Sequence, residues 1–180
     1  MQEALAAAPH YDRPTIWFHW TIAVLVPLQW GLAQIIDWFP EGEPRIAARS
    51  VHISAGLFIA VLLAARVFWR ATRGRVLPPA NHGVLQKAAK SVHYALYALL
   101  TAMVLAGMFL VYVRGDSFFG LFTVPALDPG NKALRHDIAE VHETIAALLL
   151  IVAGLHALAA LIHHFVLRDG VLRRMWPRAI

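Results

Sequence analysis

Four long apolar stretches constrain the fold of this chain more than any other feature. Three of them contain no Asp, Glu, Lys or Arg, and the fourth contains one charge, Arg66, in its last turn. The stretches have 19 to 24 residues and are Ile16–Ile36, Val51–Trp69, Val92–Val113 and Thr144–Leu167. A helix rises about 1.5 Å per residue, so each stretch is long enough to cross a hydrocarbon core about 30 Å thick.

The composition leaves little material to shield such helices from water. Of the 180 residues, 59% are hydrophobic and 15% are charged, whereas an ordinary soluble domain has roughly 25% charged residues. The mean hydropathy is +0.57. We therefore predict an all-α fold, an integral membrane four-helix bundle. It forms a single domain over residues 1–180, with spans at about 15–37, 50–70, 90–113 and 138–167.

The charges of the connecting segments predict how the bundle is oriented. The second connection contains five basic residues and no acid, and the tail after the fourth span contains four arginines against one acid, Asp169. The first and third connections mix basic residues with several acids. Because cytoplasmic loops carry the excess of Lys and Arg, both termini are expected to be cytoplasmic. The formal charge of +5 is thus a topology signal, and no nucleic-acid partner is expected.

Histidine is the residue type that carries the chemistry. The chain has no cysteine, which excludes disulfides, thiolate metal sites and covalent c-type haem attachment. A histidine in hydrocarbon needs a partner and is by default a functional candidate, although a single one is often a hydrogen-bonding residue between helices. Seven of the ten histidines lie in or beside the predicted spans: His19, His52, His93, His142, His156, His163 and His164.

The fourth span offers one imidazole near each side of the bilayer. His142 and His156 are fourteen residues apart. At about 100° and 1.5 Å per residue, they fall within about 40° of one helix face and about 21 Å apart along the axis. Two stacked haems, each bound through imidazole nitrogen, need this arrangement.

Depth in the membrane predicts the partners of these two histidines. His52 begins the second span on the outer side, where His142 begins the fourth, so the two are expected to face each other across one haem. His19 lies near the inner start of the first span, and either His156 or His163 is its partner. Depth alone favours His163. A shorter distance to His142, about 21 Å against about 31 Å, favours His156.

Small residues one turn further along the helix also favour His156, since a porphyrin needs room there. The residues four positions after His19, His52, His142 and His156 are Ala23, Gly56, Ala146 and Ala160. Two neutral imidazoles per iron give a six-coordinate haem suited to electron transfer. The alternative of a different class is a metal-ion transporter that uses the intramembrane histidines. Such sites usually add carboxylates, and no acid lies inside any span.

Five short segments match one known family. They are Phe18-His19-Trp20, Val51-His52-Ile53-Ser54-Ala55-Gly56, Tyr112-Val113-Arg114-Gly115, Val141-His142-Glu143-Thr144 and the run from Gly154 to His164. With them the chain resembles the prokaryotic di-haem cytochrome b-561 family of four-span membrane proteins, from about Tyr11 to the end. The resemblance implies an outer haem b on His52 and His142, and an inner haem b on His19 and His156.

The resemblance also implies a redox function and a location. It implies a multi-pass protein of the bacterial inner membrane, surrounded by lipid, that exchanges electrons with the quinone pool. Some members are superoxide oxidases, oxidoreductases that take electrons from periplasmic superoxide and reduce ubiquinone, and this is the function we expect. Other members are anchor subunits that connect a periplasmic dehydrogenase or hydrogenase to quinone, which gives the alternative function and a redox partner protein.

Two further groups of residues are candidates for contact with the substrates. A cationic outer surface would attract the superoxide anion, although the same residues also balance the acids nearby; its candidates are Arg45, Arg49, Arg114, Lys132 and Arg135. A quinone site needs polar contacts in an apolar slot, although aromatic and basic residues also collect at the headgroups. The quinone candidates are His163, His93, His164, Trp17 and Lys90.

Overall fold

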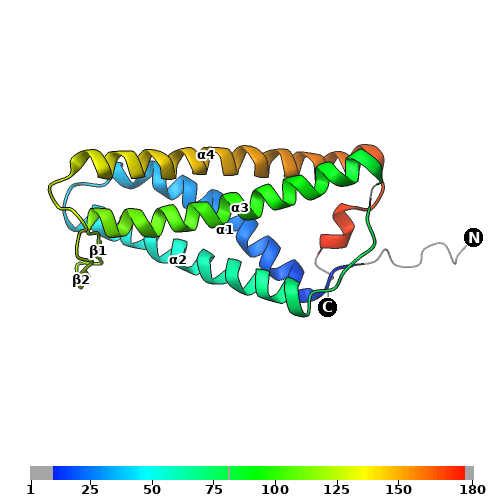
Figure 1. Ribbon diagram of the computed structural model, residues 1–180, viewed down its shortest axis with the longest axis horizontal. Helices are drawn as coiled ribbons and strands as arrows, with labels where there is room; N and C mark the ends of the chain where they lie inside the picture. The colour runs from blue at the N-terminus through cyan, green and yellow to red at the C-terminus, as the bar shows by residue number, and fades with distance from the viewer. Residues whose placement is uncertain (1–9, 81, 177–180) are drawn as a thin grey trace, which may run out of the picture.

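Four long antiparallel helices make up almost the whole molecule (Figure 1). The computed structural model describes residues 10–80 and 82–176. The helices are α1 (Arg13–Ile35), α2 (Glu43–Thr72), α3 (Gly83–Arg114) and α4 (Lys132–Ile162). All four are long and apolar enough to cross a membrane. The prediction of an all-α four-helix membrane bundle is therefore confirmed.

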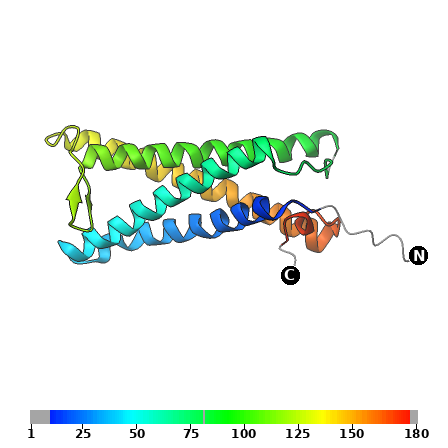
Figure 2. The same ribbon diagram turned by 90° about the horizontal axis from the view of Figure 1, so that it is seen from below.

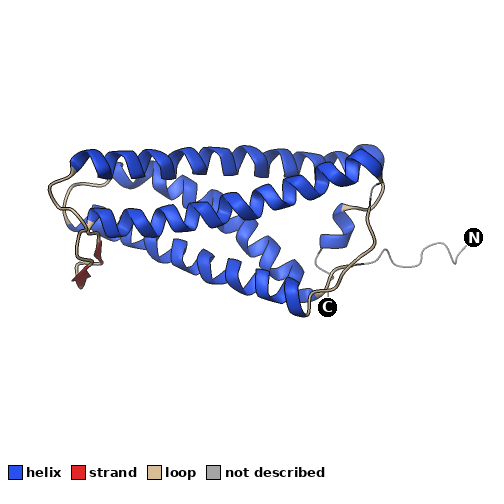
Figure 3. Cartoon of the chain, viewed as in Figure 1, coloured by secondary structure: helices blue, strands red, loops and turns tan. Residues whose placement is uncertain are grey.

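The two ends of the bundle carry different short elements. One end holds the turn η2 (Ile36–Trp38) and a small antiparallel hairpin of β1 (Ser117–Phe118) and β2 (Phe122–Thr123) (Figure 3). We call it the hairpin end. The opposite end holds the π-helical turn η3 (His163–Leu167) and the 3-10 turn η4 (Leu172–Met175). We call it the terminal end, because the first and last described residues meet there. The sequence did not predict the hairpin.

Local sequence signals set the helix boundaries. The Asp12 carboxylate caps α1 by accepting a hydrogen bond from the Thr15 backbone N–H at 3.0 Å, and Pro14 lies in the first turn. The Asn131 side chain caps α4 in the same way, from the Leu134 N–H at 2.9 Å. Such caps satisfy backbone donors that have no partner inside the helix. Helix α3 ends at Gly115, whose φ of 67° suits a residue without a side chain.

The helices pack mainly as two pairs, α1 on α2 and α3 on α4, and the pairs cross each other (Figures 1 and 2). A small buried cluster of Ile59, Leu63, Leu100 and Leu149 joins α2, α3 and α4. Most other large apolar side chains of the helices are exposed on the outside of the bundle. This distribution is typical of helices surrounded by lipid, because lipid tails are as apolar as the side chains themselves.

Candidate functional site

Two pairs of histidines face each other inside the bundle, one pair toward each end. Near the hairpin end, the rings of His52 on α2 and His142 on α4 have centroids 6.4 Å apart and planes at 79°. Near the terminal end, the rings of His19 on α1 and His156 on α4 have centroids 6.2 Å apart and planes at 80°. Helix α4 thus contributes one histidine to each pair, and two different helices supply the partners.

The separation within each pair matches two imidazoles on opposite sides of one metal ion. Imidazole nitrogen binds a transition metal at about 2.0–2.1 Å, and the ring centre lies about 1.1 Å behind that nitrogen, so the centroids would be about 6.3 Å apart. The observed values are 6.4 and 6.2 Å. Both pairs therefore leave the space that one hexacoordinate haem iron needs between its axial ligands.

The hairpin-end pair has two further features of a ligand site. The Nδ1 atoms of His52 and His142 are buried and make no hydrogen bond of ordinary geometry; each ring has only a looser polar contact with another helix, at Gln29 and Met103. A Cβ on Gly107 of α3 would lie 3.0 Å from Cε1 of His142. The absence of a side chain at this glycine therefore gives the His142 ring its space. Buried polar rings with this little hydrogen bonding fit residues whose partner is a bound group.

The terminal-end pair has a third histidine and an arginine beside it. The His93 ring on α3 lies 5.2 Å from the His156 ring, too close for a metal ion between them on opposite sides. The Arg66 Nε donates a hydrogen bond to the Tyr97 hydroxyl at 2.8 Å. The charge of Arg66 acts on His93, His156 and His19. Arg66 is thus a cation inside the bundle next to three imidazoles, a placement that usually marks a functional site.

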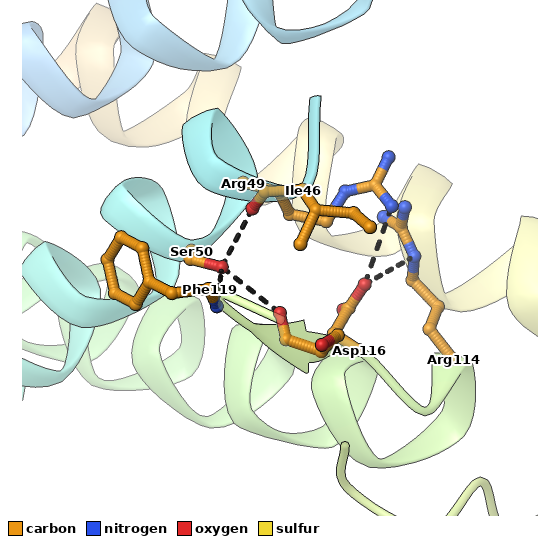
Figure 4. Close-up of polar contacts among 7 residues, drawn as sticks. Ile46, Arg49, Ser50, Arg114, Asp116 and Phe119 are labelled. Carbon is orange, nitrogen blue, oxygen red and sulfur yellow. Dashed lines mark hydrogen bonds and ion pairs between the residues drawn. The ribbon is translucent and has the colours of Figure 1, made fainter. Parts of the chain in front are cut away.

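Three arginines line a cavity of about 560 Å³ at the hairpin end, beyond the His52–His142 pair. They are Arg49, Arg114 and Arg135. Figure 4 shows Asp116 between two of them, with its Oδ1 at 3.5 Å from Arg49 Nη1 and 3.6 Å from Arg114 Nε. The third, Arg135, donates a hydrogen bond to the Pro129 carbonyl. Three cations around one acid leave a formal surplus of positive charge in this cavity.

Burial of Asp116 sets the electrostatics of this cavity. Its side chain is only 6% exposed. Burial raises the pKa of Asp116, and the charges of Arg114 and Arg49 oppose that rise. Ser50, on α2, holds the backbone that follows Asp116: it is fully buried, and its hydroxyl lies 2.7 Å from the Ile46 carbonyl and 3.1 Å from the Ser117 carbonyl. The same hydroxyl accepts a hydrogen bond from the Phe119 N–H at 2.8 Å, so it ties the hairpin to α2 (Figure 4).

The other two predicted outer cations lie apart from this cavity. Arg45 donates hydrogen bonds to the backbone carbonyls of Phe39 and Asp37 and lies 3.7 Å from the Glu41 carboxylate. Lys132 is exposed at the first residue of α4. Of the five predicted cations, the structure brings Arg49, Arg114 and Arg135 together and leaves Arg45 and Lys132 outside the group.

The five quinone candidates occupy separate places at the terminal end. Two of them contact other residues of interest: His93 packs on His156, and His163 binds the Asp169 carboxylate through Nδ1. His164 packs on Phe165 and lines a cavity of about 230 Å³ together with Arg168, Gly170 and Arg173. Trp17 is 73% exposed and Lys90 is exposed. The structure therefore does not gather these five side chains into one pocket.

Sequence analysis missed several residues of the two sites. In the sequence, Asp116 is one of several acids of the third connection, and Arg66 is the one charge of its apolar stretch. Gln29, whose Nε2 donates a hydrogen bond to the His52 carbonyl at 2.7 Å, and Gly107 were not considered. The sequence offered one signal for these residues, a polar side chain or a glycine in or beside an apolar helix. Their roles depend on contacts with other helices, which the sequence does not show.

Comparison with known proteins assigns the chain to a family. The model of the family described as prokaryotic cytochrome b561 matches residues 10–178. The chain belongs to the prokaryotic cytochrome b561 family. It is 31% identical over 173 residues to cytochrome b561 homolog 1 of Escherichia coli K12, covering 93% of this chain and 97% of the relative. It is 32% identical over 173 residues to the probable superoxide oxidase CybB of Yersinia pestis, covering 93% and 96%.

A relative of lower sequence identity is also matched over nearly its whole length. Cytochrome b562 of Cereibacter sphaeroides is 28% identical over 172 residues, covering 93% of this chain and 95% of the relative. Membership of the cytochrome b561 family makes this chain a transmembrane electron-transfer protein that binds haem b. Its four membrane-crossing helices make it a multi-pass protein of the bacterial inner membrane. The predicted family, haem b and location are thereby confirmed.

Proposed function

We propose that this cytochrome b561 family member binds two haem b groups, oxidises superoxide at its hairpin end and reduces ubiquinone near its terminal end. The observation that carries the proposal is that two histidines of α4 each face a histidine of another helix, with ring centroids 6.4 and 6.2 Å apart. His142 and His156 are fourteen residues apart on α4, about 21 Å along its axis, so the two sites together extend through most of the membrane.

Each histidine pair would hold one haem b. His52 and His142 would hold the haem at the hairpin end, and His19 and His156 the haem at the terminal end. A haem held between two imidazoles would supply one-electron transfer. The contribution of the chain is to fix the ring orientations and to exclude water around them. Helix α4 supplies a ligand to both pairs and so sets the distance between the two sites.

The cavity of Arg49, Arg114 and Arg135 supports superoxide as the electron donor. Superoxide is a small anion, and a cleft with a surplus of positive charge raises the local concentration and the association rate of such a substrate. The cavity also lies beyond the histidine pair on the hairpin side. The relative in Yersinia pestis that carries the name probable superoxide oxidase supports the same donor.

Ubiquinone is the proposed electron acceptor at the terminal end. The balanced reaction consumes two superoxide anions, one quinone and two protons, and it produces two oxygen molecules and one quinol. Histidines are the expected polar contacts of the quinone headgroup. His163 and His93 are the first candidates, because His163 lies seven residues after His156 on the same face and His93 packs on His156. His164, Trp17 and Lys90 remain secondary candidates.

The proposed orientation places the hairpin end in the periplasm. The second connection and the segment after α4 both lie at the terminal end and carry the excess of basic residues. Cytoplasmic segments carry this excess in membrane proteins. Superoxide would then react at the periplasmic face, and the protons that quinone takes up would come from the cytoplasm.

The electron donor separates this proposal from the alternative of an anchor subunit for a dehydrogenase or hydrogenase, which would receive electrons from a protein partner.

A metal-ion transporter is disfavoured by the arrangement of the histidines and acids. Within residues 10–80 and 82–176, no three side chains of His, Asp or Glu are grouped so that they could hold a metal ion.

The deciding experiment is a reduced-minus-oxidised visible spectrum of the purified protein, with haem quantified per chain, followed by addition of superoxide with and without ubiquinone. We expect two b-type haems per chain, rapid haem reduction by superoxide, and reoxidation by ubiquinone. One haem per chain would show that one histidine pair is misassigned. Two haems that superoxide does not reduce would favour the anchor subunit, and no haem in a folded preparation would overturn the proposal.

A further inference from the structure

An acid and a histidine form a pair where the chain turns back at the end of α4. The Asp169 carboxylate Oδ2 binds Nδ1 of His163. The two side chains differ in exposure, since Asp169 is 33% exposed and His163 is 20% exposed. The carboxylate is therefore the more exposed member of the pair.

The local backbone is shaped to make this contact. In a continuous α-helix, residues six positions apart point about 120° away from each other. Here α4 ends at Ile162, a π-helical turn follows, and Arg168 adopts a left-handed conformation with φ of 52°. The Asp169 N–H then donates a hydrogen bond to the His163 carbonyl at 3.3 Å, and the Val171 N–H donates one to the Asp169 carboxylate at 3.0 Å. The turn therefore brings the carboxylate back onto the ring.

The ring of this pair lies on the same stripe of the helix as the His156 site. His163 follows His156 by seven residues, two turns of α4, which corresponds to about 10 Å along the axis. The Nδ1 atom is occupied by Asp169, so Nε2 is the nitrogen that remains for another partner. A carboxylate that holds one ring nitrogen sets the tautomer and orientation of the other.

Acids are scarce at this end of the molecule. The described residues of the terminal end include two, Asp12 and Asp169. Asp12 accepts hydrogen bonds from the Thr15 and Arg75 backbone N–H groups and from the Trp69 indole, so its oxygens are fully used in holding the fold. Asp169 is the one of these two that combines solvent exposure with contact to a histidine.

The other charged and titratable groups around the pair are basic. They are His164 and Arg168 on the π-helical turn and its end, and Arg173 and Arg174 on η4, which packs against that turn. Arg174 donates a hydrogen bond to the Pro78 carbonyl at 2.7 Å, and Arg173 lines the small cavity with His164 and Arg168. Burial raises the pKa of Asp169, but the hydrogen bonds from His163 and the Val171 N–H outweigh it and keep that pKa below its ordinary value.

We propose that Asp169 and His163 form a proton-delivery pair, which takes protons from the cytoplasm and passes them through His163 Nε2 to the quinone as it is reduced. The inference rests on the proposed quinone acceptor. Each quinone gains two electrons and two protons to become quinol. For each proton, the Nε2–H bond of the protonated His163 ring breaks, a quinone O–H bond forms, and Nε2 then takes the next proton from water, while the Nδ1 proton stays on the ring against Asp169. His163 acts on the quinone, and Asp169 is a positioning residue that holds Nδ1 and orients the ring.

The test follows reoxidation of the reduced, haem-loaded protein by a short-chain ubiquinone in a stopped-flow instrument, from pH 5.5 to 9 and in H₂O and D₂O. Removal of a positioned acid–base group slows proton transfer by about 10²–10⁴-fold, so we expect His163→Gln to fall in this range and Asp169→Asn to slow reoxidation by about tenfold. Without the carboxylate the His163 ring loses the partner that orients it, so Asp169→Asn should also show a changed pH profile and a changed solvent isotope effect. Asp169→Glu should restore most of the rate.

Two controls separate this role from a structural one. Asp128→Asn makes the same chemical change at the hairpin end and should leave the quinone step and its pH profile unchanged. Haem content and haem reduction by superoxide should stay at wild-type levels in Asp169→Asn, because neither involves the pair.

Different outcomes would overturn different claims. If the wild-type protein is reoxidised by quinone and Asp169→Asn keeps its rate, pH profile and isotope effect, the pair is only a helix-end contact and the proton role is wrong. If Asp169→Asn does not assemble, an unchanged pH profile in both Asp169→Glu and His163→Gln would equally overturn it. If quinone does not reoxidise the wild-type protein, the proposed acceptor fails and the pair loses its role with it.

Discussion

The two ends of this bundle use a carboxylate in opposite ways. At the hairpin end, Asp116 lies between Arg49 and Arg114 at 3.5 and 3.6 Å, and cations outnumber it in the cavity. At the terminal end, Asp12 accepts hydrogen bonds of 2.7 to 3.0 Å from Thr15, Trp69 and Arg75. The first arrangement leaves charge available to a ligand. The second saturates the acid and joins three segments of the chain.

The pKa values of the two acids shift in opposite directions, up for Asp116 and down for Asp12. Burial raises the pKa of Asp116 because its two arginine partners compensate only in part. Burial also raises the pKa of Asp12, but hydrogen bonds from the Arg75 and Thr15 backbone and from the Trp69 indole outweigh it and bring the pKa to about 2. Multiple short hydrogen bonds stabilise a carboxylate more than long ion pairs do. The comparison therefore predicts that Asp116 affects the charge available to a ligand at the hairpin end, and that Asp12 stabilises the fold at the terminal end.

The largest expected effects come from replacing the two histidines of α4 one at a time, because each belongs to the pair at one end of the bundle. If each histidine pair holds one haem as proposed, His142→Ala should lose the haem of the hairpin end and His156→Ala that of the terminal end, each halving the haem absorbance per chain. Each variant removes one of the two imidazoles that would hold the haem at that end. His142→Ala should also abolish haem reduction by superoxide. His82→Ala, which changes an exposed histidine before α3, serves as the control. Retention of both haems in either α4 variant would contradict the assignment.

The next largest effect concerns stability at the terminal end. Asp12→Ala removes an N-cap and two contacts to α2 and the loop after it, and loss of the cap alone costs about 0.5–2 kcal/mol. Thermal unfolding in detergent should show a lower Tm at pH 7 with haem content unchanged. Asp12→Asn, which keeps the size of the side chain, should show a smaller loss.

The effect of Asp12 should disappear in acid. Its pKa is lowered from 3.8 to about 2 on folding, so its stabilisation is complete above about pH 4 and is lost as the pH falls toward 2. The difference in Tm between wild type and Asp12→Ala should therefore narrow across that range. A difference that stays constant down to pH 2 would show that the carboxylate charge is not what stabilises this joint.

A smaller, local effect is expected from Ser50→Ala at the hairpin end. The hydroxyl is fully buried and contacts the Ile46 and Ser117 carbonyls and the Phe119 N–H, so its removal leaves buried groups unpaired, at a cost of about 1–3 kcal/mol. Hydrogen exchange of the hairpin should increase, while the terminal end stays protected. Ser54→Ala, one turn further along α2, is the matched control. Equal loosening of both ends would argue against a local role.

The smallest expected effect tests the charge of the arginine cavity. Asp116→Asn raises the formal charge of its arginine and aspartate side chains from +2 to +3 (three arginines, with and without one acid), and superoxide should reduce the haem about two- to fivefold faster at low salt. Arg114→Gln should slow the same step. Salt should weaken both effects because it screens the field that attracts superoxide from solution. Asp137→Asn, an exposed acid on α4 outside the cavity, is the control; an equal gain there would indicate a general charge effect.

Much of this molecule follows from its sequence because the membrane restricts the choices. Charge-free stretches of about 20 residues in lipid must be helices, since no water satisfies the backbone groups. The fourteen-residue spacing of His142 and His156 places both on one face wherever α4 packs. The contacts of Asp12 with Trp69, of Asp116 with Arg49 and of the hairpin with Ser50 were not predictable, because the partners lie 57 to 67 residues apart in the sequence.

By itself, the sequence determined the number of helices, the family and the helix that carries a histidine toward each end, because these depend on local composition and on the period of the helix. The tertiary structure decided the rest. It brought His19 to 6.2 Å from His156 and His93 to 5.2 Å from the same ring, and it gathered three of the five predicted outer cations into one cavity. Such distances depend on the rotation and crossing of whole helices, which no single segment encodes.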